Sequence, residues 1–341
     1  AATATNCCDR DELLRPRRLA RTTGPPGASR LIRPTAVGPG MADWTHGEVV
    51  VNGVRLHHVE AGDADDPLVV LLHGFPEFWY SWREQVPALV DAGFHVVAPD
   101  MRGYNRSEKP HGVDAYRLDE LVGDVVGLLD RFDAERANVV GHDWGGVVAW
   151  ETAIRHPDRV ADLAVLNAPH PGAYRRELLG NPDQWRRSWY ALAFQLPWLP
   201  EFVLGVRDCA GIAELLSGSA ATPSTFDERD LRRYREAAGR PGALTAAINY
   251  YRALFRGELR RELGAVLEER RSLAVRVPTL LVWGERDPAL GVELTRGLDR
   301  WVADLRVERL PDAGHWVQNE RPGRVTDLLV EFLSRRERET E

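Results

Sequence analysis

The chain has 341 residues, of which 44% are hydrophobic, enough to bury the core of one large domain or two small ones. Its net charge of −7 and pI near 5.9 argue against nucleic acid as a natural partner. No apolar run approaches the roughly 18 residues that span a bilayer. The three cysteines, Cys7, Cys8 and Cys209, provide no disulfide framework, so a cytoplasmic location is expected.

Residues 1–40 differ in composition from the rest of the chain. They carry seven arginines against three acidic residues and show no periodic apolar face. Arg17-Arg18 raises the alternative of a twin-arginine export signal, but no apolar segment follows the pair. We interpret this stretch as a disordered extension ahead of Met41. Deletion of residues 1–40 should therefore leave activity unchanged.

Strands and helices alternate in the first half of the chain. Asn52-Gly53 separates two apolar strands, the pattern of a β-hairpin. The predicted elements are strands at 49–51, 54–59 and 68–72, a helix near 81–91, a strand at 95–98, a helix at 118–132, a strand at 137–140, a helix from 145 and a strand at 161–166. This order predicts a doubly wound, mostly parallel α/β sheet opened by an antiparallel hairpin.

The alternation breaks between residues 171 and 271, which look helical and rich in Trp, Leu and Arg. Within this stretch, Thr225-Phe226-Asp227-Glu228 predicts a capping box that opens one helix. Strands at 279–283 and 305–310 and an amphipathic helix at 321–332 then resume the earlier pattern. We therefore expect one α/β core, formed by residues 41–170 and 273–341, with a helical lid inserted at 171–272.

The segment Gly141-His142-Asp143-Trp144-Gly145 has the layout of a nucleophile elbow between a strand and a helix. Its small flanking residues let the backbone turn tightly enough to push the central side chain into a cleft. Aspartate stands where serine is usual, and a carboxylate ionised at neutral pH can attack without a base. Its natural target is an sp3 carbon with a leaving group. The motif therefore predicts epoxides or alkyl halides as substrates, through an alkyl ester on the enzyme.

An ester on Asp143 needs a group that hydrolyses it, and an acid followed by a histidine is expected later in the chain. Asp287, just after a strand, is the predicted acid, with Glu285 as its competitor. His315, in the loop after a later strand, is the predicted base that activates water. The nine other histidines, including His57-His58, are interpreted as structural or exposed. His57 and His58 cannot bind one metal together, because neighbours on a strand point to opposite faces. We expect no metal and no cofactor.

The turn His73-Gly74-Phe75-Pro76-Glu77 ends the third predicted strand. Such a turn can present the Phe75 N–H beside that of Trp144, which would form a two-donor oxyanion hole for ester hydrolysis. The alternative is a plain loop at the exit of the strand.

From about residue 47 to 332 the chain resembles an epoxide hydrolase of the α/β-hydrolase superfamily. The segments that carry the resemblance are 73–77, 82–85, 100–104, the GHDWGG run at 141–146, 249–252 and Gly314-His315. The resemblance implies that two lid tyrosines, Tyr190 and Tyr251, bind the epoxide oxygen, with Tyr250 as the near rival of Tyr251. Ring opening creates an alkoxide, so donors of this kind help by about 10²–10⁴-fold.

Haloalkane dehalogenases share the aspartate nucleophile and hold the departing halide with two side-chain N–H donors. Phe75, where one such donor is often found, has none, although Trp185, Trp189 or Trp198 in the lid could replace it. A dehalogenase therefore stays an alternative, as does a ligand-binding protein on the same fold without activity.

Fluoroacetate dehalogenases are similar around residues 73–76 but carry arginines just after the nucleophile. Trp144 and Val147 occupy those positions here, which argues against that activity. For the substrate, Trp189, Phe194 and Trp316 are predicted to line an apolar pocket, so the expected partners are a lipophilic epoxide and water. Core packing is the alternative for such aromatic residues.

Overall fold

The computed structural model describes residues 44–264 and 272–335, so the extension expected at 1–40 lies outside the described residues. Strands β1 (Thr45–Val51) and β2 (Val54–Ala61) form the predicted antiparallel hairpin, and both turn residues, Asn52 and Gly53, have positive φ. Among the described strands, the sheet order is β1-β2-β4-β3-β5-β6-β7-β8. β2 pairs with β4 in antiparallel fashion, and the later pairs are all parallel. The predicted α/β architecture is confirmed.

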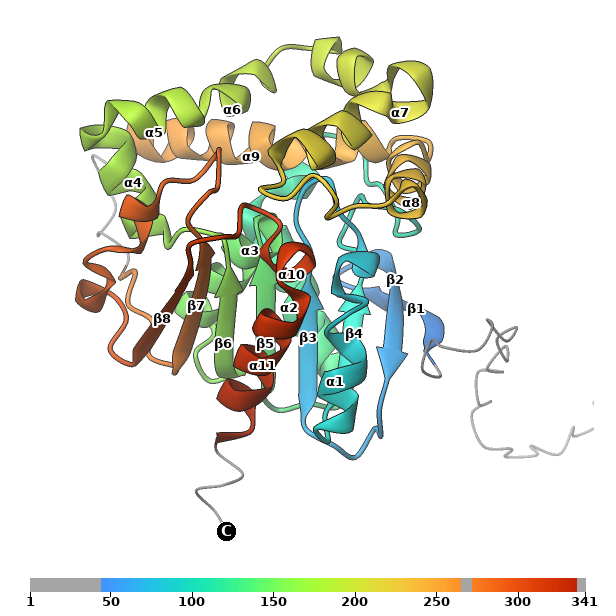
Figure 1. Ribbon diagram of the computed structural model, residues 1–341, viewed down its shortest axis with the longest axis vertical. Helices are drawn as coiled ribbons and strands as arrows, with labels where there is room; N and C mark the ends of the chain where they lie inside the picture. The colour runs from blue at the N-terminus through green and yellow to red at the C-terminus, as the bar shows by residue number, and fades with distance from the viewer. Residues whose placement is uncertain (1–43, 265–271, 336–341) are drawn as a thin grey trace, which may run out of the picture. The chain divides into compact units, whose positions relative to one another are not determined.

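The remaining strands are β3 (Leu68–Leu72), β4 (His95–Pro99), β5 (Ala137–His142), β6 (Val160–Leu166), β7 (Thr279–Gly284) and β8 (Leu305–Leu310). The helices of the core are α1 (Val86–Asp91), α2 (Leu118–Arg131), α3 (Trp144–Arg155), α10 (Val317–Glu320) and α11 (Pro322–Leu333). Figure 1 shows α1 and α11 in front of the sheet and α2 and α3 behind it. The helix expected near 81–91 is divided into a 3₁₀ turn, Trp79–Trp82, and α1. Pro87 explains the division, because proline is tolerated only in the first turn of a helix.

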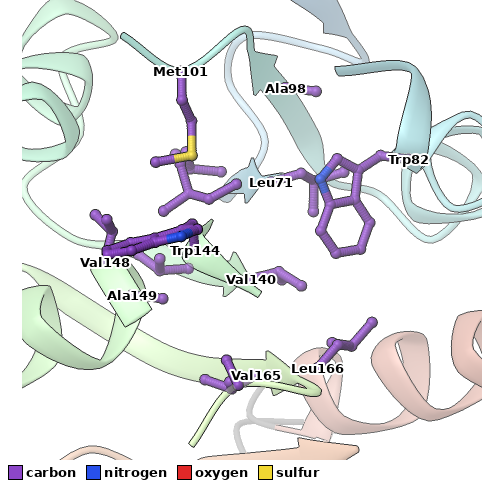
Figure 2. Packing of buried hydrophobic residues seen from close by; sticks show 14 of the residues in the cluster. Leu71, Trp82, Ala98, Met101, Val140, Trp144, Val148, Ala149, Val165 and Leu166 are labelled. Atoms are coloured by element: carbon purple, nitrogen blue, oxygen red, sulfur yellow. The ribbon is translucent and has the colours of Figure 1, made fainter. Parts of the chain in front are cut away.

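The central strands are apolar throughout because helices cover both of their faces. Every residue of β3, β4, β5 and β7 is buried. Figure 2 shows Leu71 and Val140 of the sheet in one cluster with Trp144 and Val148 of α3. This packing gives the loops at the carboxyl ends of the strands a rigid support.

Between β6 and β7 the described chain forms six helices, which we call the inserted helices. They are α4 (Pro171–Gly180), α5 (Pro182–Arg187), α6 (Trp189–Ala193), α7 (Leu199–Ser219), α8 (Glu228–Ala238) and α9 (Ala243–Gly264). Figure 1 shows them together above the ends of the strands. In the described part of the chain, none of the helices is long and apolar enough to cross a membrane.

The capping box of α8 lies two residues later than predicted. Asp227, and not Thr225, is the N-cap, and its carboxylate accepts from the main-chain N–H groups of Arg229 (2.7 Å) and Asp230 (2.8 Å). The Asp230 carboxylate accepts in return from the Asp227 N–H. The Thr225 hydroxyl instead donates within the preceding turn, to the Thr222 carbonyl. A carboxylate that accepts two N–H groups at a helix N-terminus accounts for the shift.

Candidate active site

The elbow joins β5 to α3 and holds Asp143 in an unusual backbone conformation. Asp143 has φ 49° and ψ −118°, outside the regions that non-glycine residues normally occupy. A Cβ atom on Gly145 would lie 2.1 Å from the Leu72 carbonyl oxygen, and one on Gly141 would lie 2.3 Å from the Gly145 oxygen. Only glycine fits at both positions, and the tight turn directs the Asp143 side chain towards the loops at the carboxyl ends of the strands.

The turn after β3 packs directly against this nucleophile position. The Phe75 N–H donates to Asp143 Oδ1 at 2.8 Å. A Cβ atom on Gly74 would come within 2.4 Å of the Asp143 Cβ, so the turn needs glycine to approach this closely. The Phe75 N–H therefore contacts the nucleophile position directly, and the roles of the Phe75 and Trp144 N–H groups as oxyanion donors both stay predictions.

Three loops bring the two predicted carboxylates and the histidine together. His315 Nδ1 donates to Asp287 Oδ2 at 2.7 Å, and His315 Nε2 lies 3.6 Å from Asp143 Oδ2. Asp287 is only 2% exposed, whereas Glu285, its competitor, is exposed. The geometry therefore favours Asp287 as the acid that orients His315.

The charges of this cluster set the protonation of His315. Burial by itself lowers the pKa of His315, but the carboxylates of Asp287 and Asp143 raise that pKa well above its usual value. For Asp287, burial raises the pKa, and the neighbouring His315 and hydrogen bonds from Asn167 and a main-chain N–H more than offset this. The cluster is thus arranged to hold a proton on His315 as long as both carboxylates are charged.

Asn167, directly after β6, is a site residue that the sequence reasoning missed. Its amide Nδ2 donates to Asp287 Oδ2 at 2.8 Å, and its Oδ1 accepts from the Gly284 N–H at 2.8 Å. The other carboxylate oxygen of Asp287 accepts from the N–H groups of Ala289 and Leu290. The available signal was a polar residue at the carboxyl end of a buried strand. Because β6 and β7 are parallel neighbours in the sheet, a residue directly after β6 lies close to the loop that carries Asp287.

A second buried pair, Glu77 and His142, lies behind the nucleophile. Glu77 Oε2 is 2.6 Å from His142 Nδ1 and also accepts from the Gly74 N–H at 3.0 Å. His142 Nε2 donates to the His315 carbonyl at 2.8 Å. Burial would raise the pKa of Glu77, but the interaction with His142 lowers it to about 2. The pair joins the Phe75 turn, the elbow and the His315 loop. Nothing in the sequence distinguished His142 from the other structural histidines.

Tyr190 of α6 and Tyr251 of α9 face each other, with ring centroids 5.9 Å apart. The Tyr251 ring packs edge-on against Trp144 (5.0 Å) and Phe75 (5.5 Å). Burial raises the pKa of both tyrosines well above the usual value, and Asp143 contributes in the same direction. Both phenols therefore keep their proton and can act as hydrogen-bond donors.

Tyr250, the rival of Tyr251, has a different environment. Its side chain is fully buried, and its hydroxyl donates to the Arg102 carbonyl at 2.7 Å. Because this hydroxyl is already engaged with the core, Tyr251 is the better candidate for contact with substrate.

Of the three predicted pocket residues, Phe194 and Trp316 lie at the site. Phe194 is 8% exposed, and its ring packs against Phe75 (5.4 Å) and Tyr251 (4.9 Å). Trp316 packs edge-on against His315 at 4.7 Å, and its indole N–H donates to Ser219 Oγ.

Trp189 is a correction to the sequence-based expectation. Its side chain is 66% exposed, so we do not place it in the pocket. Tyr190 and Phe194 are four residues apart and share the inner face of α6, and Trp189 falls outside that face.

The alpha/beta hydrolase fold family matches residues 67–322. The AB hydrolase superfamily protein YfhM of Bacillus subtilis is 42% identical over 285 residues, which cover 84% of this chain and 96% of that protein. Epoxide hydrolase A of Mycobacterium tuberculosis is 38% identical over 321 residues (84% and 96%). The crystal structure of epoxide hydrolase A from Mycobacterium thermoresistibile is 36% identical, with a TM-score of 0.72 over 86% of this chain and 98% of that one.

The fold, the elbow and the family match place the chain in the α/β-hydrolase fold family. Several relatives of similar coverage are epoxide hydrolases from animals and bacteria. Within the α/β hydrolases, the chain belongs to the epoxide hydrolases.

Proposed function

We propose that this chain converts a lipophilic epoxide and water into a vicinal diol, through a covalent ester on Asp143. The observation that carries the proposal is the position of the Asp143 carboxylate. It accepts from the Phe75 N–H on one side and lies 3.6 Å from His315 on the other. The protonated phenols of Tyr190 and Tyr251 belong to the same cluster. Phe75 and Phe194 add apolar rings, which supports a lipophilic substrate.

In the first step, a carboxylate oxygen of Asp143 forms a bond to one epoxide carbon while the bond from that carbon to the ring oxygen breaks. The oxygen leaves as an alkoxide on the neighbouring carbon. Tyr190 and Tyr251 hydrogen-bond this oxygen, and one phenol transfers its proton to it. The raised pKa of each phenol suits a donor, since the group stays protonated until an alkoxide develops beside it.

In the second step, the ester is hydrolysed. Alkylation removes the negative charge of Asp143, so one of the two carboxylates that raise the pKa of His315 is lost. His315 then gives up its extra proton, which returns to the phenolate left by the first step, and neutral His315 can accept a proton from water. The resulting hydroxide attacks the ester carbonyl carbon, and the N–H groups of Phe75 and Trp144 are expected to stabilise the oxyanion. Collapse of this intermediate breaks the bond between the former ester carbon and the diol oxygen, and the acid proton of the Asp143 carboxyl passes to that oxygen, which releases the diol and restores the carboxylate.

The alternative of a haloalkane dehalogenase is disfavoured because its candidate N–H donors to the departing halide do not face the site. Trp185, Trp189 and Trp198 are all exposed on the inserted helices, and Phe75 has no side-chain N–H. The alternative of a protein without activity is disfavoured because His315 lies 2.7 Å from Asp287 and 3.6 Å from Asp143, an arrangement that supports the second step.

The proposal is tested by trapping the ester. The His315→Gln variant should accumulate it, so intact-mass spectrometry after mixing with a lipophilic epoxide should show an adduct of the whole epoxide mass on Asp143. The double variant with Asp143→Asn should show none. A haloalkane adduct that has lost the halogen would instead favour a dehalogenase, and the absence of an adduct with both reagents would refute the covalent mechanism.

The tyrosines are tested separately by pre-steady-state kinetics. Tyr190→Phe and Tyr251→Phe should each slow ester formation by about 10²–10⁴-fold and leave ester hydrolysis unchanged. Tyr250→Phe is the matched control, because its hydroxyl is engaged with Arg102, and should form the ester at the normal rate. Normal rates in both test variants would remove the tyrosines from the mechanism.

A further inference from the structure

The loop that carries Asp287 is bound by one buried side chain of the inserted helices, Gln184 of α5, which is only 2% exposed. The amide nitrogen of Gln184 donates to the Ala289 carbonyl at 3.0 Å, and its amide oxygen accepts from the Gly291 N–H at 3.0 Å. Glutamine can make both contacts at once because its amide has a donor and an acceptor. Figure 1 shows α5 on the same side of the molecule as β7, the strand that this loop follows.

The turn that Gln184 contacts is also the turn that binds the Asp287 carboxylate. Asp287 Oδ1 accepts from the N–H groups of Ala289 (2.8 Å) and Leu290 (3.0 Å). The Ala289 carbonyl and the Leu290 N–H belong to one peptide group, and in a trans peptide these two bonds point in opposite directions. Gln184 therefore binds one side of the peptide group whose other side binds the carboxylate. The direction of this peptide group, and with it the position of the carboxylate, is fixed from both sides.

Gln184 also contacts the segment that carries Tyr190. Its amide nitrogen donates to Ser188 Oγ at 3.1 Å, and Ser188 is the N-cap of α6, two residues before Tyr190. Arg187 adds a second link to the loop, since its guanidinium donates to the Asp287 carbonyl at 2.7 Å. The end of α5 is thus joined both to the loop of the catalytic acid and to the beginning of the helix that carries the phenol.

The simpler role for such a residue is to join two segments without effect on the chemistry, as the contacts of Gln195 indicate. Gln195 Nε2 donates to the carbonyls of Ala191 and Tyr251, so its hydrogen bonds join the end of α6 to α9. Gln184 differs from Gln195 because it binds the peptide group that holds the acid. The two glutamines lie in the same stretch of the inserted helices, which makes one a matched control for the other.

We propose that Gln184 is a positioning residue for ester hydrolysis, which acts through Asp287 and couples the placement of α5 and α6 to the orientation of His315. The inference rests on the proposed function, since it assigns a further residue to the second step. Without Gln184 the peptide group between residues 289 and 290 can rotate, and the carboxylate of Asp287 is held less firmly against His315. Efficient hydrolysis of the ester therefore requires that the segment with Tyr190 is in place.

Gln184→Met keeps the length of the side chain and removes its hydrogen bonds. Single-turnover kinetics with styrene oxide should show ester hydrolysis slowed by about 10- to 100-fold, because a small displacement of a catalytic group has an effect of this size. Gln195→Met makes the same chemical change and should hydrolyse the ester at the normal rate. In an Asp287→Ala background, Gln184→Met should slow hydrolysis no further, as expected for two residues that act as one unit. Unchanged circular dichroism and Tm would verify that each variant is folded.

A second measurement uses the protein without substrate, so its result does not depend on the proposed function. NMR detects the proton that His315 Nδ1 donates to Asp287, and its signal is assigned by its loss in His315→Gln. This proton should exchange with water at least about tenfold faster in Gln184→Met, because a loosened hydrogen bond opens more often. The exchange rate in Gln195→Met should equal that of the unsubstituted protein.

Three results would overturn the proposal. The first is an unchanged exchange rate of the His315 proton in Gln184→Met. The second is a normal rate of ester hydrolysis in that variant. The third is an equal slowing by Gln184→Met with and without Asp287, which would show that Gln184 does not act through the acid. If no ester forms in any variant, the proposed function fails, and the exchange rate alone decides whether Gln184 positions the pair of Asp287 and His315.

Discussion

Replacing Asp143 with asparagine removes one negative charge beside His315 while keeping the size of the side chain and one acceptor oxygen. His315 Nε2 lies 3.6 Å from Asp143 Oδ2, and both side chains are largely buried. At this distance two unit charges attract by about 1 kcal/mol in water and by about 5 kcal/mol at an effective dielectric constant of about 20. The pKa of His315 should therefore fall in Asp143→Asn, as it should when the ester forms.

The measurement is an NMR titration of isotope-labelled histidine in both proteins. The His315 signal is assigned by its loss in His315→Gln. Its midpoint should move to lower pH in Asp143→Asn, and the signal of the exposed His111 should not change between the two proteins. If His315 titrates at the same or a higher pH in the variant, Asp143 does not hold its proton. The account of how the ester makes His315 a base would then be wrong.

The pKa of Glu77 in the folded protein is lowered from its usual 4.5 to about 2. Glu77 therefore contributes stability that is present above pH 4.5 and is lost as the pH falls towards 2. Urea unfolding of Glu77→Gln should show a smaller loss over this interval. Asn167→Ala leaves a buried main-chain N–H unpaired, which should lower the free energy of unfolding by about 1–3 kcal/mol, and single-turnover kinetics should show slower ester hydrolysis. Gly145→Ala should prevent soluble, active expression because its Cβ would lie 2.1 Å from a main-chain oxygen, whereas Gly180→Ala, with open space around it, should be tolerated. Three results would contradict these expectations. They are a Glu77→Gln variant that loses as much stability in acid as the unsubstituted protein, an Asn167→Ala variant with an unchanged free energy of unfolding, and a Gly145→Ala enzyme that is soluble and active.

The features predictable from the sequence are those that depend on neighbouring residues. The Asn52-Gly53 hairpin, the buried strands and the Asp143 elbow follow from turn chemistry and apolar periodicity, which act over a few residues. Asp143 and His315 could be selected because the elbow is a local motif and the order of its partners constrains the search. The capping box was misplaced within the same stretch because Thr225 and Asp227 are both good N-cap residues, and only the backbone decides between them.

Only the tertiary structure decides between neighbours that differ in direction. Asp287 rather than Glu285 contacts His315, and Tyr250 rather than Tyr251 donates to the Arg102 carbonyl, because the two side chains of each pair leave the loop or helix in different directions.

Trp189 faces solvent for the same reason, as Tyr190 and Phe194 occupy the inner face of α6. The pair of Glu77 and His142 depends on three loops that meet although they are far apart in the chain. The local pattern thus selected the type of nucleophile and base, whereas the packing of distant segments determined which side chains support them.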